Sequence, residues 1–501
     1  MEWRFIMEIR YKSTRGNGET ITASEAILKG LADDGGLFVP TAVPSLECDL
    51  ASLADMNYRE VAYLVMSKFF SDFTEKELKN CIDHAYDSKF DTPEIAPLVS
   101  AGKYELLELF HGATIAFKDM ALSILPHLLT TAAKKNAIEN EIVILTATSG
   151  DTGKAALAGF ADVPGTRIIV FYPKGGVSHV QELQMVTQKG ENTFVVGVNG
   201  NFDDAQTGVK KMFNDSALKA QLNENHFQFS SANSINIGRL VPQVAYYVWA
   251  YGQMCKKGKI APGEKINFVV PTGNFGNILA GYFAKQMGVP VGRLICASND
   301  NKVLYDFFKT GVYDRKRKFI LTSSPSMDIL ISSNLERLIY LITGESEENN
   351  RLYMKQLNVE GRYEISKEQK SHLSDFFGGF ATEAENAAGI RKHFEEEHYI
   401  TDTHTGVAVC VYDKYVEETG DTTPAVIVST ASPYKFARSV MTAIDEKYDA
   451  KDDFALIQEL NNISGIPIPN AIVEILNADI RHKTVCNIDE MEKEVKGFLK
   501  I

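Results

Sequence analysis

One lysine of this chain stands between an aromatic residue and a carboxylate, in the stretch His111-Gly112-Ala113-Thr114-Ile115-Ala116-Phe117-Lys118-Asp119. A protonated lysine is a poor nucleophile, and an apolar pocket or a nearby cation remedies this by lowering its pKa. Phe117 and Ile115 are candidates for the apolar wall of such a pocket, in which Lys118 could form an imine with an aldehyde cofactor. An isolated Phe-Lys-Asp sequence is more often a solvated lysine paired with its acidic neighbour, here Asp119. The choice between the two interpretations therefore depends on the other motifs.

A candidate anion site follows the strand-like run Ile142–Ala147. The next residues are Thr148-Ser149-Gly150-Asp151-Thr152-Gly153, and a helix-like run begins at Lys154. Free backbone N–H groups and the positive end of the helix dipole converge at such a turn. It is not a nucleotide-binding phosphate loop, because Thr148 replaces the required first glycine and Ala155 replaces the required Ser or Thr. A tight turn into a capped helix remains the alternative.

A second turn of this kind follows the run Ile266–Val270. It reads Pro271-Thr272-Gly273-Asn274-Phe275-Gly276-Asn277 and leads into the helix-like run Ile278–Met287. Glycines allow the backbone to approach an oxyanion closely, and the Asn and Thr side chains add donors. A helix capped by Asn277 is the alternative, but the loop holds more Gly and Asn than a cap requires. The sequence therefore favours a cofactor phosphate here.

Between these two turns, Ser234, Asn236 and Arg239 precede the apolar run Leu240–Ala250. A positive charge near a helix start opposes the helix dipole, so Arg239 is easier to explain if its guanidinium binds an anion together with its two polar neighbours. A substrate phosphate would suit this site. The alternative is a capped helix that carries a surface arginine.

Near the C-terminus, the run Ala425–Ser429 leads into Thr430-Ala431-Ser432-Pro433-Tyr434-Lys435-Phe436. The Thr430 hydroxyl would stand at the end of a strand, where it could face a pyridine nitrogen and leave that ring neutral. Taken alone, the motif is only a polar transition from strand to turn.

The ten histidines form no ligand cluster, so we expect no metal site and interpret His404 as a structural hydrogen bonder.

The periodicity predicts an α/β fold with parallel strands and helices on both sheet faces, because short β-branched runs alternate with turns and helical runs. Ligands of such sheets bind beyond the carboxyl ends of the strands. We expect an N-terminal segment at residues 1–97, a catalytic core at 98–440 with a charged, lid-like helical insertion near 299–399, and a helical tail at 441–501. The predicted strands are Ile142–Ala147, Arg167–Tyr172, Thr193–Val198, Ile266–Val270, Leu294–Ala297, Val407–Val411 and Ala425–Ser429.

Composition narrows the class of protein. The chain has 501 residues, 45% of them hydrophobic, and a net charge of -13. The negative charge argues against nucleic acid or an anionic membrane as the main partner, and no apolar run approaches the roughly 18 residues of a membrane-spanning helix. The six cysteines lie far apart without a CxxC pair, and the first residues lack an apolar signal core. We expect a reduced, cytoplasmic compartment.

As an ordered set, these motifs resemble the threonine synthase family, in the longer form of enterobacteria and fungi. This family belongs to the tryptophan-synthase-β-like pyridoxal-phosphate enzymes of fold type II. The stretch Leu31-Ala32-Asp33-Asp34-Gly35-Gly36-Leu37-Phe38-Val39-Pro40 is similar to its N-terminal signature, and the resemblance covers about Thr14 to Phe436. It implies two doubly wound three-layer α/β subdomains with mostly parallel sheets, an N-terminal segment and a helical insertion.

The resemblance also implies the cofactor pyridoxal 5'-phosphate and the conversion of O-phospho-L-homoserine and water to L-threonine and phosphate. We expect a monomer or weak homo-oligomer. Lys118 would hold the cofactor and act as a general base. The other implied contacts are Gly273, Asn274, Phe275, Gly276 and Asn277 with the cofactor phosphate, Thr430 with the pyridine nitrogen, Asp151 near the ring hydroxyl, Ser149, Gly150 and Thr152 with the substrate carboxylate, and Ser234, Asn236 and Arg239 with the substrate phosphate. Ser432 and Tyr434 stand where the family often has His and Ala.

Two alternatives stay open at this point. Another enzyme of the same cofactor fold, such as a hydroxy-amino-acid dehydratase or a β-replacement synthase, is the nearer one. Arg239 argues against the dehydratase, because an unphosphorylated substrate needs no second anion site. The other alternative is a catalytically inactive homologue that binds or regulates, and an intact Lys118 argues against it.

Overall fold

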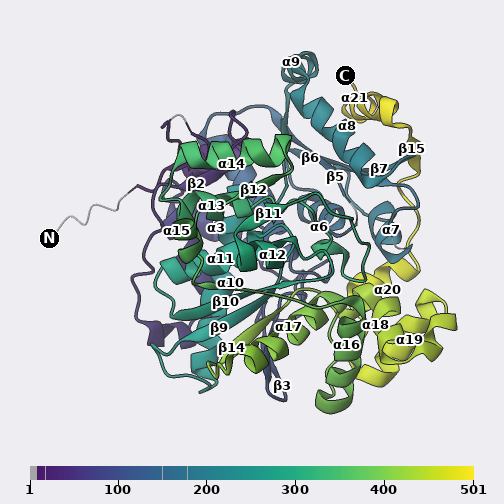
Figure 1. Cartoon of the computed structure of the whole chain (residues 1–501). Coiled ribbons are helices and arrows are strands. Elements are labelled where there is room, and N and C mark those ends of the chain that lie inside the picture. Colours follow the sequence, from purple (N-terminus) through teal and green to yellow (C-terminus); the bar gives the residue numbers. More distant parts are fainter. Residues whose placement is uncertain (1–7, 17, 149, 178) are drawn as a thin grey trace.

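Two mostly parallel sheets organise the chain, which the computed structural model describes over residues 8–16, 18–148, 150–177 and 179–501 (Figure 1). The first sheet has five parallel strands in the order β15-β7-β6-β5-β8. Their bounds are β15 Thr484–Cys486, β7 Thr193–Val198, β6 Thr166–Pro173, β5 Glu141–Ala147 and β8 Phe227–Ser230.

The second sheet has six strands in the order β13-β10-β9-β14-β4-β3, and only the β3–β4 pair is antiparallel. Their bounds are β13 Phe376–Phe380, β10 Val291–Ser298, β9 Ile266–Pro271, β14 Ala425–Ser429, β4 Tyr104–Glu108 and β3 Leu98–Ala101. Two short antiparallel pairs lie outside these sheets, namely β1 Tyr11–Ser13 with β2 Phe38–Pro40, and β11 Val312–Asp314 with β12 Arg362–Glu364.

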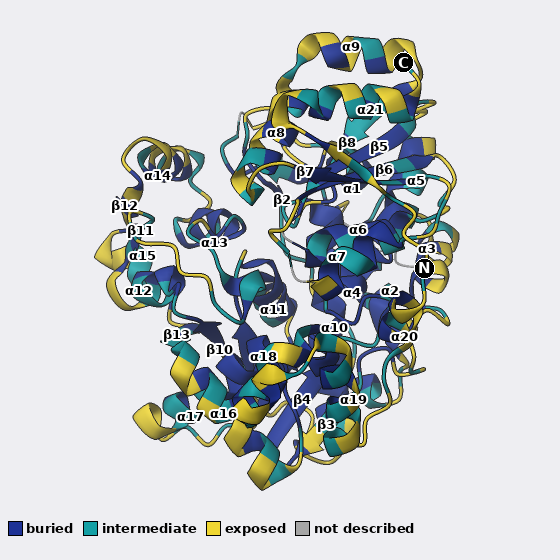
Figure 2. Ribbon diagram, turned by 90° about the vertical axis from the view of Figure 1, so that its right-hand side faces the viewer, coloured by how far each residue is buried: buried dark blue, intermediate teal, exposed yellow. Residues whose placement is uncertain are grey.

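Helices surround both sheets. Figure 2 shows the central strands, such as β4, β5, β6 and β10, and helix α10 as mostly buried, while exposed residues gather on outer helices such as α9 and α16. The α-helices are α1 Ala23–Lys29, α2 Tyr58–Phe69, α3 Glu75–Ala85, α4 Asp119–Leu122, α5 Leu125–Lys135, α6 Asp151–Phe160, α7 His179–Val186, α8 Phe202–Asn214, α9 Ser216–Glu224, α10 Ile237–Lys256, α11 Gly276–Gln286, α12 Val303–Thr310, α13 Leu335–Ile342, α14 Glu347–Val359, α15 Lys367–Ser371, α16 Glu383–Glu397, α17 Thr403–Thr419, α18 Ala437–Ile444, α19 Asp453–Ser464, α20 Asn470–Leu476 and α21 Met491–Leu499. Short 3₁₀ turns are η1 Leu50–Ala54, η2 Pro325–Met327, η3 Pro433–Phe436, η4 Glu446–Ala450 and η5 Ile488–Glu490.

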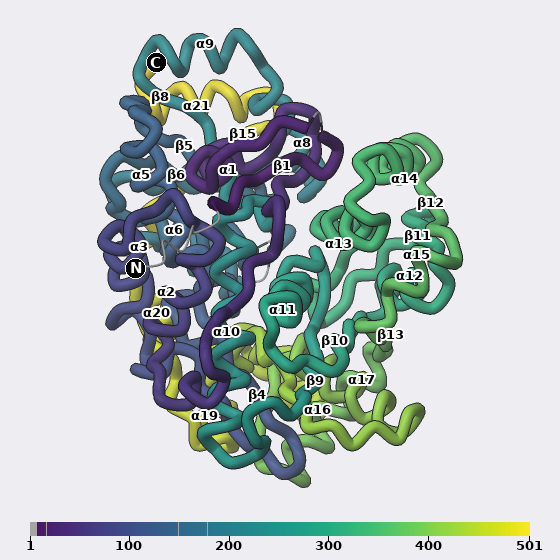
Figure 3. Tube along the Cα trace, turned by 90° about the vertical axis from the view of Figure 1, so that its left-hand side faces the viewer, coloured from purple at the N-terminus to yellow at the C-terminus, as the bar shows by residue number. Residues whose placement is uncertain are grey.

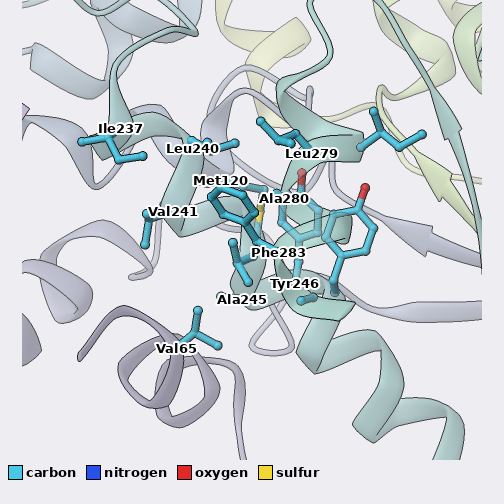
Figure 4. Close-up of a cluster of buried hydrophobic side chains, with 14 of the residues drawn as sticks. Val65, Met120, Ile237, Leu240, Val241, Ala245, Tyr246, Leu279, Ala280 and Phe283 are labelled. Carbon is cyan, nitrogen blue, oxygen red and sulfur yellow. The ribbon is translucent and has the colours of Figure 1, made fainter. Parts of the chain in front are cut away.

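Helix α10 lies at the centre of the core. Every residue from Ile237 to Met254 is buried, as expected of a helix that is apolar on all sides. Figure 4 shows where it packs against its neighbours, with side chains from α2, α4, α10 and α11 meeting in one cluster. The labelled members are Val65, Met120, Ile237, Leu240, Val241, Ala245, Tyr246, Leu279, Ala280 and Phe283.

The N-terminal segment connects parts of the molecule that are distant in sequence. In Figure 3 it runs as a purple trace from β1 and α1 past α10 and α11. The Ile27 carbonyl accepts a hydrogen bond from the Asn236 side chain at 3.0 Å, and the Leu46 N–H donates to the Met287 carbonyl at 2.9 Å. The segment therefore contacts both the start of α10 and the end of α11.

The predicted α/β fold with mostly parallel sheets is confirmed, and six of the seven predicted strands are present. The prediction of a strand at Val407–Val411 is wrong, because this run lies inside α17. Asp402 caps that helix by accepting from the N–H groups of His404 and Thr405, and Gly420 ends it with φ of 67°. The valines pack against Val269, Ile295 and Ile427 of the six-stranded sheet, so burial outweighs the strand preference of β-branched residues.

Two segments that were expected to be helical also contain strands. The range 299–399 is not only helical, because β13 adds an edge strand to the six-stranded sheet beside β10. The tail at 441–501 is likewise not only helical, because β15 pairs with β7 at the edge of the five-stranded sheet. Both segments are thus built into the sheets.

Among the described residues, no helix combines the length and apolar character needed to cross a bilayer.

His111 connects the lysine motif to the chain before it. Its Nδ1 lies 2.6 Å from Asp91 Oδ1, and its Nε2 lies 2.9 Å from Glu108 Oε2. Burial lowers the pKa of His111, but these two carboxylates outweigh burial and raise it to about 9. A histidine whose pKa rises on folding stabilises the fold fully below its unfolded pKa of about 6.5. That stabilisation is lost as the pH rises through 9.

We therefore expect His111→Gln to lower the melting temperature more at pH 6.5 than at pH 9.5. At pH 6.5 the substitution removes a charged imidazole that pairs with two carboxylates, whereas at pH 9.5 most of the ring is already neutral. Thermal unfolding of the variant and the unmodified protein, followed by circular dichroism at both pH values, measures this. Equal differences in melting temperature at the two pH values would contradict the assignment.

Candidate active site

The predicted motifs converge beyond the carboxyl ends of strands from both sheets. The Thr148–Gly153 turn follows β5, the segment leading to Arg239 follows β8, and the 271–277 turn follows β9. Thr430 follows β14, where the Phe117 N–H donates to the Thr430 carbonyl at 2.8 Å. Lys118 follows β4 in the chain. The parallel sheets bring these loops together, as open α/β sheets do for their ligands.

Lys118 is almost enclosed, with 11% of its side chain exposed. Its Nζ lies 4.9 Å from the centre of the Phe117 ring, as predicted for the apolar wall. Burial lowers the pKa of Lys118, and the charges of Lys435 and Arg239 act in the same direction, while Asp151 opposes them. The solvated ion pair with Asp119 is not formed, because Asp119 accepts instead from the N–H and hydroxyl of Thr114.

Asp151 is the nearest acid to this lysine. Its Oδ2 lies 3.7 Å from Lys118 Nζ, and its Oδ1 lies 3.3 Å from the fully buried Nζ of Lys435. Gln181 Nε2 donates to Oδ1 at 2.9 Å. Burial raises the pKa of Asp151, but Lys435 and Lys118 outweigh burial and hold the pKa well below its usual range. A buried charge needs such partners, since an unpaired one is strongly disfavoured.

Ser326 of η2 stands between the lysine and the acid. Its Oγ accepts from Lys118 Nζ and donates to Asp151 Oδ2, each at 3.1 Å. Its N–H donates to His404 Nε2 at 3.2 Å, and His404 Nδ1 lies 2.7 Å from Asp402 Oδ2. This pattern places the His404 proton on Nδ1. His404 is a hydrogen bonder, as predicted, and it holds η2 against the site.

The 271–277 turn has the geometry of an anion-binding loop. A Cβ on Gly273 would lie 2.3 Å from the Ser326 carbonyl oxygen, so only glycine fits there. Phe275 adopts φ of 63° and is the N-cap of α11 without a side-chain cap bond, so the predicted alternative of a cap by Asn277 is not formed. Asn277 Oδ1 accepts from the hydroxyls of Tyr246 and Tyr247, each at 2.7 Å. Its Nδ2 is buried and finds no partner among the described residues.

The Thr148–Gly153 turn is only partly described, because Ser149 lies outside the described residues. Gly150 adopts φ of 135°, and a Cβ there would meet the Gln181 side chain at 2.6 Å. The N–H groups of Gly150 and Gly153 both donate to Thr148 Oγ1, at 3.0 and 2.9 Å. Thr152 lies half-buried in the first turn of α6 beside Asp151. The carboxylate contacts predicted for this turn stay predictions.

Arg239 is buried beneath the loop that follows β8, with 3% of its surface exposed. Its Nη1 donates to the Ala232 carbonyl at 2.9 Å, while its Nε finds no partner among the described residues. The surface arginine considered as an alternative is therefore ruled out. Burial lowers the pKa of Arg239 to about 10, and its charge is close enough to lower the pKa of Lys118.

The two polar neighbours of Arg239 differ from each other. Asn236 caps α10 by accepting from the Gly238 N–H at 2.8 Å, and its Nδ2 donates to the carbonyls of Ile27 and Ser231. A substrate contact through this side chain would require it to give up one of these bonds. Ser234 is half-buried, and its carbonyl accepts from Asn334 Nδ2 at 3.2 Å.

Sequence reasoning missed several residues of this site, namely Lys435, Ser326, Gln181 and Asn334. Lys435 stands in the Thr430 motif, but nothing local marks it as buried. Ser326 and Asn334 come from the range interpreted as an insertion, and they reach the site only through the fold. Thr430 itself is buried, and its hydroxyl forms no hydrogen bond within the part of the chain that the structure describes.

The comparisons with known proteins agree with this geometry. The sequence matches three protein-family models in chain order, described as threonine synthase N terminus at residues 10–86, pyridoxal-phosphate dependent enzyme at 96–351, and threonine synthase C-terminal at 405–484. Threonine synthase of Schizosaccharomyces pombe is 37% identical over 474 residues, which cover 88% of this chain and 90% of that protein. Threonine synthase-like 1 of Homo sapiens is 39% identical over 457 residues, which cover 89% of this chain. The chain spans 61% of the length of that relative.

Among solved structures, pyridoxal-phosphate-bound threonine synthase from Brucella melitensis aligns with a TM-score of 0.86 at 34% identity, covering 98% of this chain and 100% of that one. Fold and site thus define a pyridoxal-phosphate-dependent enzyme. Within that class, the chain belongs to the threonine synthase family. The family predicted from the motifs is confirmed, and so is the cofactor.

The residues present fit this cofactor. The buried Lys118 amine has a lowered pKa and so provides a nucleophilic nitrogen. Asn277 Nδ2, which has no partner within the described part of the chain, provides a buried donor beside the glycine turn at the start of α11, where an anionic phosphate is favoured.

We expect Asp151→Asn to lower the pKa of Lys118 further, because it removes the negative charge that most strongly opposes burial. The pH dependence of Lys118 acylation in cofactor-free protein, read by mass spectrometry, measures this pKa. Ser326→Ala is the control, since it removes a hydrogen bond to the same amine without changing charge. An unchanged midpoint in Asp151→Asn would show that the carboxylate does not set the pKa.

Proposed function

We propose that this chain catalyses the threonine synthase reaction, in which O-phospho-L-homoserine and water give L-threonine and phosphate. The observation that carries the proposal is the buried Arg239, whose Nε has no partner among the residues that the structure describes. A buried guanidinium with an unused donor is strongly disfavoured unless an anion pairs with it. Its charge also lowers the pKa of Lys118, which supports assigning this second anion site to the same catalytic centre. A dehydratase of unphosphorylated substrates would have no use for it.

Pyridoxal phosphate, when bound, supplies the electron sink for the charge that develops as the substrate loses a proton. The 273–277 loop would hold its phosphate, Lys118 Nζ would attach it, and the Thr430 hydroxyl would meet its ring nitrogen. The low pKa of Asp151 keeps that carboxylate ionised beside the two lysines. In this setting the charge of Asp151 holds the Nζ groups of Lys118 and Lys435 in place. Its position near the ring hydroxyl is part of the proposal.

Lys118 Nζ serves as the general base, because its lowered pKa leaves more of the amine free near neutral pH. When this nitrogen is not attached to the cofactor, Ser326 Oγ and Asp151 Oδ2 receive it, as the hydrogen bond at 3.1 Å and the ion pair at 3.7 Å indicate. Arg239, Ser234 and Asn236 are proposed to hold the substrate phosphate and then the departing phosphate, Asn236 by giving up one of its present hydrogen bonds. Ser149, Gly150 and Thr152 are proposed for the substrate carboxylate. Enclosure of Lys118 limits the access of water before addition.

We further propose a cytoplasmic location and a monomer or weak homo-oligomer, with domain limits at residues 97 and 440. All six cysteines are free thiols, which supports a reducing compartment. The alternatives of a dehydratase or a β-replacement synthase remain outcomes of the assay below.

Purified protein with pyridoxal phosphate and O-phospho-L-homoserine is expected to release phosphate and L-threonine in equal amounts, and Lys118→Ala is expected to release neither. Phosphate is measured colorimetrically and amino acids by chromatography. Phosphate with a keto acid instead of threonine would change the assignment to elimination. No phosphate at all would exclude this substrate.

Arg239→Met is expected to lower kcat/KM for O-phospho-L-homoserine by on the order of 10- to 100-fold, through a higher KM, because charge-assisted hydrogen bonds to the phosphate are lost. Inorganic phosphate should also inhibit this variant less. Arg167→Met is the matched control, since Arg167 pairs with Glu141 on β5 and is partly exposed. An unchanged KM in Arg239→Met would place the substrate phosphate elsewhere.

A further inference from the structure

We propose that Asn334 and Arg337 are positioning residues that fix the spacing between the cofactor-phosphate loop, residues 273–277, and the substrate-phosphate loop, residues 234–239. The proposal deepens the proposed function and rests on it for the identity of the two anions. Neither residue belongs to a motif that the sequence singled out, and both come from the start of α13.

Asn334 contacts both loops with a single amide group. It is fully buried, and its backbone N–H and Nδ2 both donate to the Asn274 carbonyl, at 3.0 and 3.1 Å. The same Nδ2 donates to the Ser234 carbonyl at 3.2 Å. One nitrogen therefore ties the turn after β9 of the six-stranded sheet to the loop after β8 of the five-stranded sheet.

Arg337 fixes the orientation of that amide. Its Nη1 donates to Asn334 Oδ1, which leaves Nδ2 facing the two loops. Its Nη2 donates to the Ile235 carbonyl at 2.6 Å and its Nε to the Phe38 carbonyl at 2.8 Å. The side chain is fully buried. All these acceptors are neutral oxygens, so this charge lacks the compensation of a bonded carboxylate. Its rigid fork of donors suits a positioning role, since it holds three separate segments at once.

The residues just before Asn334 strengthen the link to the cofactor loop. Ser332 Oγ donates to the Gly273 carbonyl at 2.7 Å, and the Ser332 N–H donates to the Tyr313 hydroxyl at 2.7 Å. The start of α13 thus contacts the loop at Gly273 and Asn274 and contacts the substrate loop at Ser234 and Ile235. A shift of this segment would change the distance between the two anion sites.

That distance matters chemically. The substrate carries its amino group and its phosphate on different carbons of one chain. The amino group must reach the cofactor, which the 273–277 loop would hold, while the 234–239 loop would bind the substrate phosphate. The two loops must therefore stand a fixed distance apart. A misplacement of about 1 Å at a reacting centre lowers rates by orders of magnitude. Asn334 and Arg337 set this spacing without contacting either anion.

The test compares Asn334→Ala with Asn350→Ala. Asn350 is also fully buried, and its Nδ2 donates to the Thr14 carbonyl at 3.0 Å and to Glu336 Oε1 at 3.1 Å, away from both loops. Both variants lose two donated bonds, and Asn334→Ala also loses the bond that its Oδ1 accepts from Arg337, so its loss of melting temperature is expected to be at least as large as that of Asn350→Ala. Only Asn334→Ala is expected to raise the Kd for pyridoxal phosphate and the KM for O-phospho-L-homoserine, each about tenfold.

Asn334→Asp is the second variant, because it keeps the acceptor for Arg337 and loses both side-chain donations. It is expected to raise the same two constants. If Asn334→Ala does not fold, Asn334→Asp replaces it in the comparison with Asn350→Ala. Wild-type Kd and KM in both Asn334 variants, or equal changes in Asn350→Ala, would overturn the proposal. The Kd is measured by fluorescence titration of cofactor-free protein and needs no turnover. If the wild type makes no threonine, the proposed function fails, while the Kd comparison still decides the role of Asn334.

Discussion

The site depends on one constraint, which is that the buried charges of Lys118, Asp151 and Lys435 must stay together. Each is almost fully enclosed, and a buried charge without a partner is strongly disfavoured. The three residues lie on the loop after β4, on the first turn of α6 and on η3 after β14. Their pairing therefore requires strand ends from both sheets to meet. It also explains the chemistry, because burial and Lys435 lower the pKa of Lys118 while Asp151 limits the shift.

Around this cluster, the two sheets hold different parts of the site. The six-stranded sheet presents the glycine turn after β9 and Thr430 after β14, whereas the five-stranded sheet presents the turn after β5 and the loop that leads to Arg239. The segment between η2 and α13 joins them. Ser326 contacts Lys118 and Asp151, and Asn334 contacts both anion loops. The range interpreted as an inserted lid thus supplies connections on which the site is built.

Sequence patterns predicted much of the fold, and their failures have physical causes. The β-branched runs at residues 142–147 and 266–270 are strands, as predicted. A parallel strand that is buried on both faces needs apolar residues at nearly every position, and both runs meet this requirement. The run Val407–Val411 has the same composition but follows the strong cap Asp402 and packs on a sheet as part of α17. The edge strands β13 and β15 are short, and each exists because it pairs with a strand far away in the chain. Local composition cannot report such pairing.

By itself, the sequence determined the chemistry and its order along the chain. It placed one lysine in an apolar motif, two glycine turns at helix starts and an arginine before an apolar helix, because these are local patterns of residue type and spacing. Only the tertiary structure decided which groups meet. Ser326 stands 208 positions after Lys118, and Lys435 bonds to Gln184 251 positions before it. Such contacts are fixed by the packing of elements around the two sheets, and packing depends on the whole chain and not on any one motif.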